Sequence, residues 1–379
     1  MRAPRLRPSR RHLAALLAAP FLAAAAPPGG LRVTDMLGRD VLLPRQPRRI
    51  ILLDARDIVA MALLHPDPAS LVAGWAGPEL LDSDLLRRSY GAPPGGGSIP
   101  VVGGVSPESR SPEAILALAP DLVVATAQAE PDLAGSQLLR QLAAAGIPAV
   151  FSSADANRPD ATGAAEDPAG SLVRLMALWG TLLGREAEAE AFTAFVRQRL
   201  GTVSARLASV APCPTYLEVQ STYDECCWAA GGRIWGALLA LAGGRVPAAA
   251  GGRWFAKLSP EQLIAEAPEA YIATGGAYAP GLRPAIGPGL DPQAARAGLR
   301  RLAARPGLAL LPAIRDGRVH GIWSGLVAIR PLNLLFVEAA ARWLHPALFH
   351  DLDPGETLRL INTRFLARPL PGPLWVSLS

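Results

Sequence analysis

The stretch Ser111–Thr126, SPEAILALAPDLVVAT, is nearly repeated in the stretch Ser259–Thr274, SPEQLIAEAPEAYIAT. Eight of the sixteen aligned positions are identical. In both, Ser followed by Pro and Glu predicts a helix start, because the hydroxyl caps free N–H groups, Pro fits the first turn, and Glu suits its positive end. Pro120 or Pro268 then ends the helix, and the apolar run that follows predicts a buried strand. One such unit in each half of the chain predicts two similar α/β lobes with a cleft between them.

The segments around the two copies alternate between strand and helix patterns. The expected elements of the first half are a hairpin at 32–41, strands near 49–54, 71–75 and 149–152, and helices at 57–64 and 137–145. Such alternation is typical of parallel sheets covered by helices. Apolar residues recur at helical spacing from 169 to about 209, which predicts one long helix, or two in line, between the halves. In the second copy, Gln262 completes a capping box that Ala114 cannot form in the first.

Length and charge favour a two-domain exported protein over a nucleic-acid binder. A chain of 379 residues is long enough for two hydrophobic cores. Its formal charge is +5, but the first 26 residues contain five arginines and no acid. Removing these five from the 37 basic residues leaves 32, which equals the 32 acidic residues. The basic excess therefore belongs to a targeting segment and not to a binding surface.

The first 26 residues are typical of an export signal. Their apolar part, Leu13 to Ala26, is too short to cross a bilayer, and Ala24 and Ala26 fit a cleavage site. The run Ser9-Arg10-Arg11 resembles a twin-arginine signal, and an ordinary secretory signal is the alternative. Either route predicts a periplasmic protein that is cleaved near Ala26. No other stretch is long and apolar enough to predict a membrane helix.

Three cysteines, Cys213, Cys226 and Cys227, leave two interpretations open. Export permits a disulfide, in which Cys213 would pair with Cys226 or Cys227. Buried free thiols are the alternative. The spacing of the three residues fits no metal site.

Motifs for catalysis and nucleotide binding are missing from the sequence. The single lysine, Lys257, lies outside any phosphate-binding loop, and there is no dinucleotide fingerprint, nucleophile elbow or zinc-protease motif. Of five histidines, only His320 is expected where a strand could lead into the cleft. Several His and carboxylate ligands therefore cannot easily converge on a bare metal ion. We expect no enzyme activity, no cofactor and no protein-bound bare metal.

Several short segments together resemble the substrate-binding proteins of ABC importers for iron–siderophore, haem and cobalamin. These segments are Val33–Val41, Pro47–Ile51, Pro120–Val124, Leu241–Gly244 and Trp343–Pro354. The resemblance covers nearly the whole chain after the signal. It implies two Rossmann-like lobes with mainly parallel sheets, at 27–165 and 211–379, joined by one long helix at 166–210. It also implies a monomer that delivers a small cargo to an ABC permease and its ATPase.

Ligands of open α/β sheets gather outside the carboxyl ends of the strands. Flat rings at such places suit a planar or apolar-rimmed chelate, and guanidinium forks suit its anionic oxygens. The expected ligand-binding residues are Arg56, Tyr223, Trp228, Arg233, Trp254, Tyr278, Trp323 and Arg330. Trp235 opens a helical run and is expected in the core. The aliphatic segment Gly325–Ile329 replaces a polar, aromatic stretch of many relatives and leaves the cargo open, since it would line the cleft.

Acidic residues after the two repeat copies are candidates for permease docking. In proteins of the family that the chain resembles, an acid on each lobe generally pairs with permease arginines. Glu130 or Asp132 follows the first copy, and Asp291 follows the second. Ordinary surface acids are the alternative interpretation of all three.

The sequence thus predicts a periplasmic binding protein for a ferric-siderophore-type chelate. Haem and cobalamin are alternative cargoes within the same class. A doubly wound α/β enzyme and a secreted structural or adhesion module are the alternatives from other classes.

Overall fold

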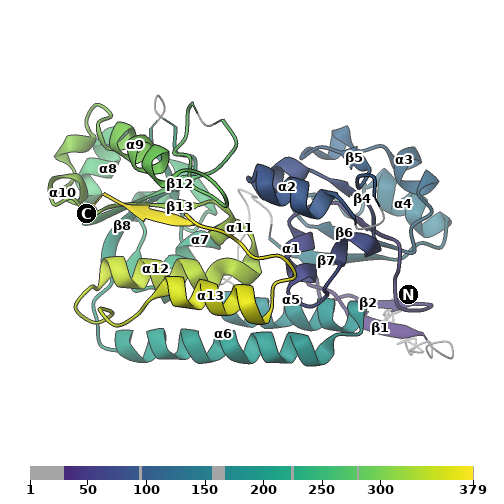
Figure 1. Cartoon of the computed structure of the whole chain (residues 1–379). Helices are drawn as coiled ribbons and strands as arrows, with labels where there is room; N and C mark the ends of the chain where they lie inside the picture. Colours follow the sequence, from purple (N-terminus) through teal and green to yellow (C-terminus); the bar gives the residue numbers. More distant parts are fainter. Residues whose placement is uncertain (1–29, 94–95, 156–166, 223–225, 280, 379) are drawn as a thin grey trace, which may run out of the picture.

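The computed structural model describes residues 30–93, 96–155, 167–222, 226–279 and 281–378. In these residues the chain forms two α/β lobes that lie side by side along the helix α6 (Glu186–Leu207), as Figure 1 shows. The predicted α/β fold with two lobes is confirmed. The predicted export signal and Tyr223 lie outside the described residues.

The N-terminal lobe is built on an all-parallel sheet with the strand order β5-β4-β3-β6-β7. Its strands are β3 (Ile50–Leu52), β4 (Val72–Ala76), β5 (Val101–Gly103), β6 (Leu122–Thr126) and β7 (Ala149–Ser153). Its helices are α1 (Asp57–Ala62), α2 (Asp84–Gly91), α3 (Pro112–Ala117) and α4 (Gln137–Ala144). The chain adds β4 and β5 on one side of β3 and then returns to add β6 and β7 on the other. The expected hairpin is also present, as β1 (Leu31–Thr34) paired with β2 (Asp40–Leu43).

The C-terminal lobe carries a mixed sheet of seven strands with the order β11-β9-β8-β12-β13-β14, in which β10 also pairs with β8. Its strands are β8 (Cys213–Glu218), β9 (Trp228–Ala230), β10 (Gly244–Arg245), β11 (Phe255–Lys257), β12 (Ala270–Gly275), β13 (Val319–Trp323) and β14 (Trp375–Ser377). Its helices are α7 (Trp235–Leu241), α8 (Pro260–Glu266), α9 (Pro292–Ala303), α10 (Pro312–Arg315), α11 (Gly325–Ala328), α12 (Asn333–Leu344) and α13 (Pro354–Arg364). The pairings among β8, β10, β12 and β13 are parallel, whereas β9 pairs with β8, β11 with β9 and β14 with β13 in antiparallel fashion.

The repeated sequence forms the same unit in both lobes, α3 with β6 and α8 with β12. Ser111 accepts a hydrogen bond from the N–H of Ala114, and Ser259 and Gln262 form the expected capping box. Every residue of β6 and β12 is buried, as the apolar runs predicted. The two copies even share an uncommon backbone state, since Ala119 and Ala267, at equivalent positions before Pro, have φ of +44° and +45°.

The segment between the lobes is not one helix. The helix α5 (Pro168–Leu183) ends at Gly184, whose left-handed φ of +62° stops it, and α6 begins two residues later. The two helices pack against each other and do not run in line (Figure 1). Gly180 allows this approach, because a Cβ there would lie 2.9 Å from the Cβ of Ala189. α5 therefore packs on the N-terminal lobe, and α6 alone runs on to the other lobe.

Two guanidinium groups fix α6 on the C-terminal lobe. Arg199 binds the fully buried Glu338 of α12 with a Nε–Oε1 distance of 2.7 Å. About two helical turns further on, Arg206 binds both carboxylate oxygens of Asp351, at 2.6 and 2.8 Å. The hydrogen bonds from Arg206 lower the pKa of Asp351 to about 2. Since both pairs lie on the second half of α6, the first half remains for α5 and the N-terminal lobe.

The C-terminal tail makes a second connection between the lobes. After α13, the N–H of Ala367 donates to the carbonyl of Ala62 at 2.8 Å. Arg368 then lies over the ring of Tyr90, 5.7 Å from its centroid, and donates to Ser89. The chain returns to the C-terminal lobe as β14, which pairs with β13. We call residues 365–374 the strap; the sequence assigned them wholly to the C-terminal lobe.

The cysteines adopt neither predicted pairing. Cys226 is joined to the adjacent Cys227, and Cys213 is a buried free thiol. Burial raises the pKa of the Cys213 thiol, although Arg318 lies beside it. The expectation of a free thiol is therefore met at Cys213 alone.

The two left-handed alanines give a test of the repeat. Replacing Ala119 or Ala267 by Gly should each raise the free energy of unfolding by about 1 kcal/mol, because Gly adopts this conformation without a Cβ clash. Urea denaturation measures the change. The matched control, Ala265→Gly inside the right-handed α8, should lower stability by about 1 kcal/mol. If all three variants lower the free energy of unfolding, the left-handed backbone at Ala119 and Ala267 is not strained.

Candidate functional site

A cavity opens between the lobes where the strand order of the N-terminal sheet reverses. The loops after β3 and β6 leave this point in opposite directions, so the carboxyl ends of the two strands border a crevice. The N-terminal lobe lines the cavity with Asp54, Arg56, Asp57, Ala60, Thr126, Gln128, Ser152, Ser153, Asp155, Pro168 and Leu175. The C-terminal lobe lines it with Ile234, Trp235, Leu238, Trp254, Val327, Ala328, Ile329, Arg330, Pro331 and Asn333.

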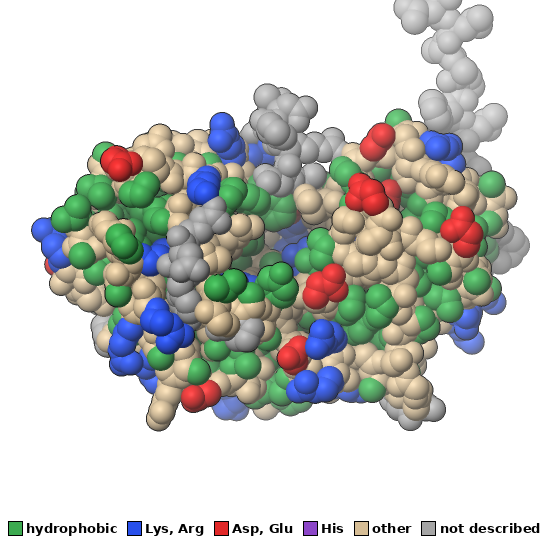
Figure 2. Space-filling model, turned by 90° about the horizontal axis from the view of Figure 1, so that it is seen from above, with side chains coloured by type: hydrophobic (Ala, Val, Ile, Leu, Met, Phe, Trp, Pro, Cys, Tyr) green, Lys and Arg blue, Asp and Glu red, His purple; other side chains and the backbone are tan. Residues whose placement is uncertain are grey.

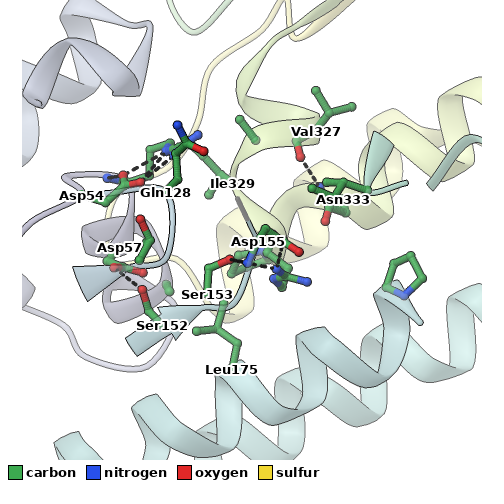
Figure 3. Close-up of a pocket in the computed structure, with 18 of the residues that line it drawn as sticks. Asp54, Asp57, Gln128, Ser152, Ser153, Asp155, Leu175, Val327, Ile329 and Asn333 are labelled. Atoms are coloured by element: carbon green, nitrogen blue, oxygen red, sulfur yellow. Dashed lines mark hydrogen bonds and ion pairs between the residues drawn. The ribbon is translucent and has the colours of Figure 1, made fainter. Parts of the chain in front are cut away.

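The cavity is open to solvent, and its two walls differ in polarity. Counted with its open mouth, it holds about 870 Å³ of empty space. Figure 2 shows the molecule hollowed between the lobes, with basic side chains visible inside the depression. The close-up in Figure 3 shows polar side chains such as Asp57 and Ser152 on the side of the N-terminal lobe, and Val327 and Ile329 facing them. One wall is therefore rich in carboxyl and hydroxyl groups, and the other is mostly apolar and aromatic.

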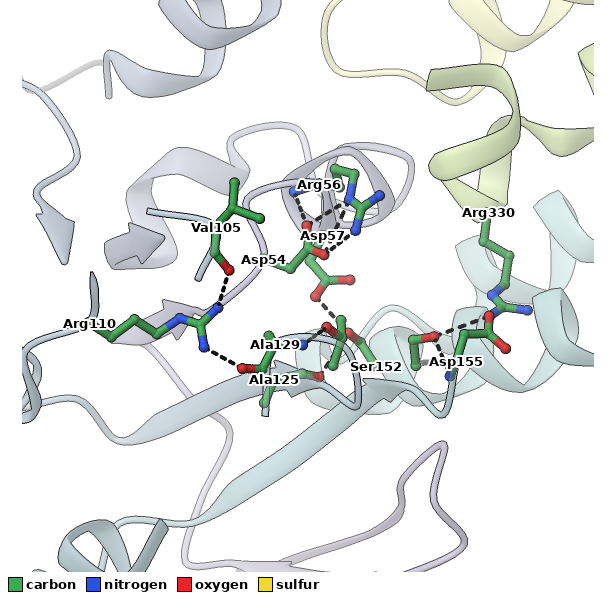
Figure 4. A network of polar contacts seen from close by, with 12 residues as sticks. Asp54, Arg56, Asp57, Val105, Arg110, Ala125, Ala129, Ser152, Asp155 and Arg330 are labelled. Carbon is green, nitrogen blue, oxygen red and sulfur yellow. Dashed lines mark hydrogen bonds and ion pairs between the residues drawn. The ribbon is translucent and has the colours of Figure 1, made fainter. Parts of the chain in front are cut away.

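Asp54 and Arg56 form a closed pair at the floor of the cavity. Arg56 donates to Asp54 through Nε, at 2.9 Å, and through a terminal nitrogen, and its backbone N–H donates to the same carboxylate at 3.0 Å (Figure 4). Burial alone would raise the pKa of Asp54, but the charge and hydrogen bonds of Arg56 outweigh it and hold the pKa below its ordinary value. Asp54 is therefore charged, and its oxygens are occupied by the fork of Arg56.

Asp57 lies beside this pair but has a different environment. It begins α1, is only 8% exposed, and accepts a hydrogen bond from the hydroxyl of Ser152 at 2.7 Å. Burial and the negative charge of Asp54 raise the pKa of Asp57 to about 7, against smaller opposing effects of Ser152 and Arg56. A carboxyl group that is partly protonated at neutral pH thus lines the cavity.

An ion pair crosses the cavity between the lobes. Arg330, at the start of a short helical turn after α11, binds the carboxylate of Asp155 beyond β7 and reaches Ser153 at 3.4 Å. Both partners are mostly buried, with side-chain exposures of 16% and 17%. The pair ties the position of the C-terminal wall to the end of the N-terminal sheet (Figure 4).

Two tryptophans form the aromatic part of the C-terminal wall. Trp235 and Trp254 meet edge to face, with ring centroids 6.2 Å apart. Neither buried indole nitrogen has a hydrogen-bond partner among the described residues. Both nitrogens are shielded from solvent, so the two residues present ring surface, and not their N–H groups, to the cavity.

The structure brings together three of the eight residues expected to bind ligand. Arg56, Trp254 and Arg330 line the cavity, whereas Trp228, Arg233, Tyr278 and Trp323 do not. Tyr278 is 68% exposed and lies beside Asp82, and Lys257 lies over the ring of Trp228. Trp235, which was expected in the core, does line the cavity, as does the aliphatic stretch 327–329.

Trp323 takes part in a clasp between the lobes and not in the cavity wall. It is fully buried because Gly287 and Gly325 leave room for its ring, and its indole donates to the carbonyl of Asp82 at 3.1 Å. Asp82 follows β4 in the N-terminal lobe. Its carboxylate accepts from three groups of the other lobe, the N–H of Tyr278, a terminal nitrogen of Arg283 and the hydroxyl of Ser324. We call these five residues and Gly276, whose backbone lies against the carboxylate, the clasp.

Of the expected docking acids, Glu130 is not on the surface. It is 7% exposed, pairs with the buried Arg110 at 3.2 Å, and accepts from the hydroxyl of Ser136 at 2.9 Å. A carboxylate held in this way cannot reach a permease arginine, so this expectation is corrected. Asp132 and Asp291 are exposed, and each accepts backbone N–H groups near the start of a helix.

Two features are absent from the described part of the chain. It contains no group of three His, Cys, Asp or Glu side chains placed to hold a metal ion. Nor does any helix in this part have the length and apolar character needed to cross a membrane.

Comparison with known proteins assigns the chain to a family. The family model described as periplasmic binding protein matches residues 65–324. The chain belongs to this family. It is therefore the substrate-binding protein of an ABC importer and not an enzyme, and its partners are a permease and a small ligand. No curated protein matches the sequence of this binding protein significantly.

Solved structures agree with the fold of the binding protein. A TroA-like periplasmic binding protein from Veillonella parvula is 22% identical, with a TM-score of 0.77, over 92% of this chain and 100% of the other. The molybdate-binding periplasmic protein of a Haemophilus influenzae ABC transporter is 19% identical, with a TM-score of 0.70, over 90% and 99%. A protein of an ABC-type Fe³⁺-hydroxamate transport system from Saccharomonospora viridis is 20% identical, with a TM-score of 0.59, over 83% and 99%. At these identities the likeness concerns the fold.

The clasp of the binding protein can be tested through Asp82. Replacing Asp82 by Ala leaves Arg283 and two further donors without their acceptor, so the free energy of unfolding should fall by about 3 kcal/mol. Urea denaturation measures the loss. Asp84→Ala is the control, because its ion pair with Arg87 is exposed and should change stability by less than about 1 kcal/mol. Equal, small effects of the two variants would show that the clasp does not hold the lobes together.

Proposed function

We propose that this periplasmic binding protein captures a ferric-siderophore-type chelate in the cavity between its lobes. One observation carries the proposal: two tryptophan rings and one arginine from each lobe line the same cavity. Such a chelate surrounds its iron with oxygen atoms and exposes apolar edges. The guanidinium groups of Arg56 and Arg330 suit those oxygens, and the rings of Trp235 and Trp254 suit the edges.

The two arginines of the cavity are suited to orienting a cargo by hydrogen bonds, and less suited to neutralising a strongly anionic cargo. Arg56 and Arg330 each already pair with a carboxylate, Asp54 and Asp155. Each guanidinium has five N–H donors in a planar fork. A guanidinium that binds the two oxygens of one carboxylate therefore still has N–H donors for a cargo. They position a chelate by hydrogen bonds at its rim. Haem and cobalamin, the other cargoes expected from the sequence, are tested directly below.

Capture and release in this proposal use a small movement of the lobes. α6 and the strap both run between the lobes, and the clasp and the Arg330–Asp155 pair close them across the cavity. Cargo enters from the open side and adds contacts to both walls. The permease, by gripping both lobes, would break the clasp and the pair and open the cavity.

We also propose that Asp132 and Asp291 contact the permease, one from each lobe. Their exposure and their places after the two repeat copies support this. Asp132→Asn with Asp291→Asn should leave cargo affinity unchanged and reduce uptake through the reconstituted permease several-fold. The single carbonyl oxygen of Asn can still accept one backbone N–H at each position, so loss of the negative charge is the main change. Loss of cargo binding in this variant would contradict the assignment.

Titration calorimetry and quenching of tryptophan fluorescence test the cargo. A ferric trihydroxamate, a ferric tricatecholate, haem, cobalamin and molybdate are added separately to the purified protein. We expect binding of at least one ferric chelate with a dissociation constant near or below about 1 μM, or about −8 kcal/mol. Binding of haem or cobalamin alone would replace the proposed cargo, and binding of molybdate alone would exclude an organic chelate.

The aromatic wall gives a prediction for the same assay. Trp254→Ala and Trp235→Ala remove ring surface that a bound chelate would cover, so each should weaken chelate binding about tenfold. Calorimetry measures the dissociation constants. Trp375→Ala in β14, away from the cavity, is the matched control and should not change them. If the cavity variants bind like the control, the two rings do not contact cargo.

A further inference from the structure

The charged residues that line the cavity do not balance. Among the described lining residues there are three carboxyl groups, Asp54, Asp57 and Asp155, and two guanidinium groups, Arg56 and Arg330. Asp54 takes Arg56, and Asp155 takes Arg330. Asp57 is the third carboxyl, and no ion pair with a described residue compensates it.

The groups packed around Asp57 confirm that it lacks a cation. From its own loop it faces the Asp54–Arg56 pair, in which the Arg56 fork is turned to Asp54. β7 contributes the neutral hydroxyl of Ser152, and α5 contributes the indole of Trp179. The nearby Arg110 is turned away, since it binds Glu130 and the carbonyl groups of Val105 and Ala129. From the other lobe, Arg330 is bound to Asp155.

A buried carboxyl group without a cation is costly unless a bound molecule completes it. A cargo that places a positive group or a hydrogen-bond donor at the floor of the cavity would complete Asp57. A polyanionic cargo would meet Asp57 with like charge.

We propose that Asp57 is a specificity-determining residue, which receives a protonated amine or another hydrogen-bond donor of the cargo and selects cationic or neutral chelates over polyanionic ones. This assignment rests on the proposed function, because it concerns the cargo of the same cavity. Asp57 acts as a charge filter at the floor of the cavity, opposite the aromatic rings of the C-terminal wall.

The pKa of Asp57 predicts the direction in which cargo affinity changes with pH. In the empty protein this pKa is about 7, raised first by burial and then by Asp54. A bound cation favours the carboxylate and lowers the pKa in the complex, so binding releases a proton. Affinity for a cationic chelate must then be full above about pH 7 and fall as the pH drops below it, by up to about tenfold per pH unit. An anionic chelate must show the opposite trend.

The experiment compares three iron(III) complexes that differ in charge. Calorimetry of the full mature protein is run from about pH 5.5 to about pH 8.5 with a cationic ferric trihydroxamate, a neutral ferric trihydroxamate and a triply anionic ferric tricatecholate. Repeating each titration in buffers of different ionisation enthalpy counts the protons exchanged. We expect the cationic complex to bind at least about tenfold more tightly than the anionic one at about pH 8, with proton release near neutrality.

The variant Asp57→Asn removes the charge and keeps the shape. It should abolish the pH dependence and the proton release, and weaken the cationic complex about tenfold while changing the neutral one by less than about threefold. Asp84→Asn, which removes an exposed carboxylate outside the cavity, is the control. The proton count in the unmodified protein needs no variant, so the test does not depend on the folding of Asp57→Asn.

The outcomes separate the two proposals. Preference for the tricatecholate, or a pH profile that Asp57→Asn leaves unchanged, would overturn the role of Asp57 and leave ferric chelates as cargo. Binding of haem, cobalamin or molybdate and of none of the three complexes would overturn the proposed function, and the assignment of Asp57 with it.

Discussion

The reversal of strand order between β3 and β6 is the constraint on which the rest of this protein depends. Since β4 and β5 extend the sheet on one side and β6 and β7 on the other, the loops after β3 and β6 diverge, and neither can cover the strand ends. Asp54, Arg56 and Asp57 follow the first strand, and Thr126 and Gln128 follow the second. The N-terminal lobe therefore has an open polar crevice that only another body can close, and α7 and α11 of the second lobe close it.

The contacts that close the crevice are polar, which suits an interface that has to open. Asp82 reaches into the C-terminal lobe by hydrogen bonds and an ion pair, and Arg330 reaches back to Asp155. Water can replace such partners when the lobes part, whereas separation of an apolar interface would expose surface that water cannot satisfy. The permanent attachments have a different character, as the contacts of Phe192 and Phe195 on α6 with Phe365 show.

Local sequence patterns predicted the units of this fold and missed the contacts made over long distances. The repeat gave α3 with β6 and α8 with β12, including the capping box at Ser259, because caps and buried strands depend on near neighbours. Two helices in line were one of the two expectations for residues 169–209, but their packing against each other after Gly184 was not expected, since a Gly in a helical pattern also fits a mere bend. Single residues at strand ends were poor guides to the site, because their partners lie far away in the sequence. The indole of Trp323 binds a carbonyl group 241 positions away. The carboxylate of Glu130 binds Arg110, a pairing that no local pattern predicts. The carboxyl groups after β3 were visible in the sequence, but only the fold shows that Asp57 lacks a cation.

The strap has a mechanical consequence. Together with α6 it attaches the lobes at two separate places, as two hinges attach a door to its frame. A body fixed at one point can tilt and twist in any direction, but one fixed at two points can only swing about the line that joins them. We infer that the strap limits any relative motion of the lobes mainly to rotation about the line between these two attachments, so that opening exposes the same two faces each time.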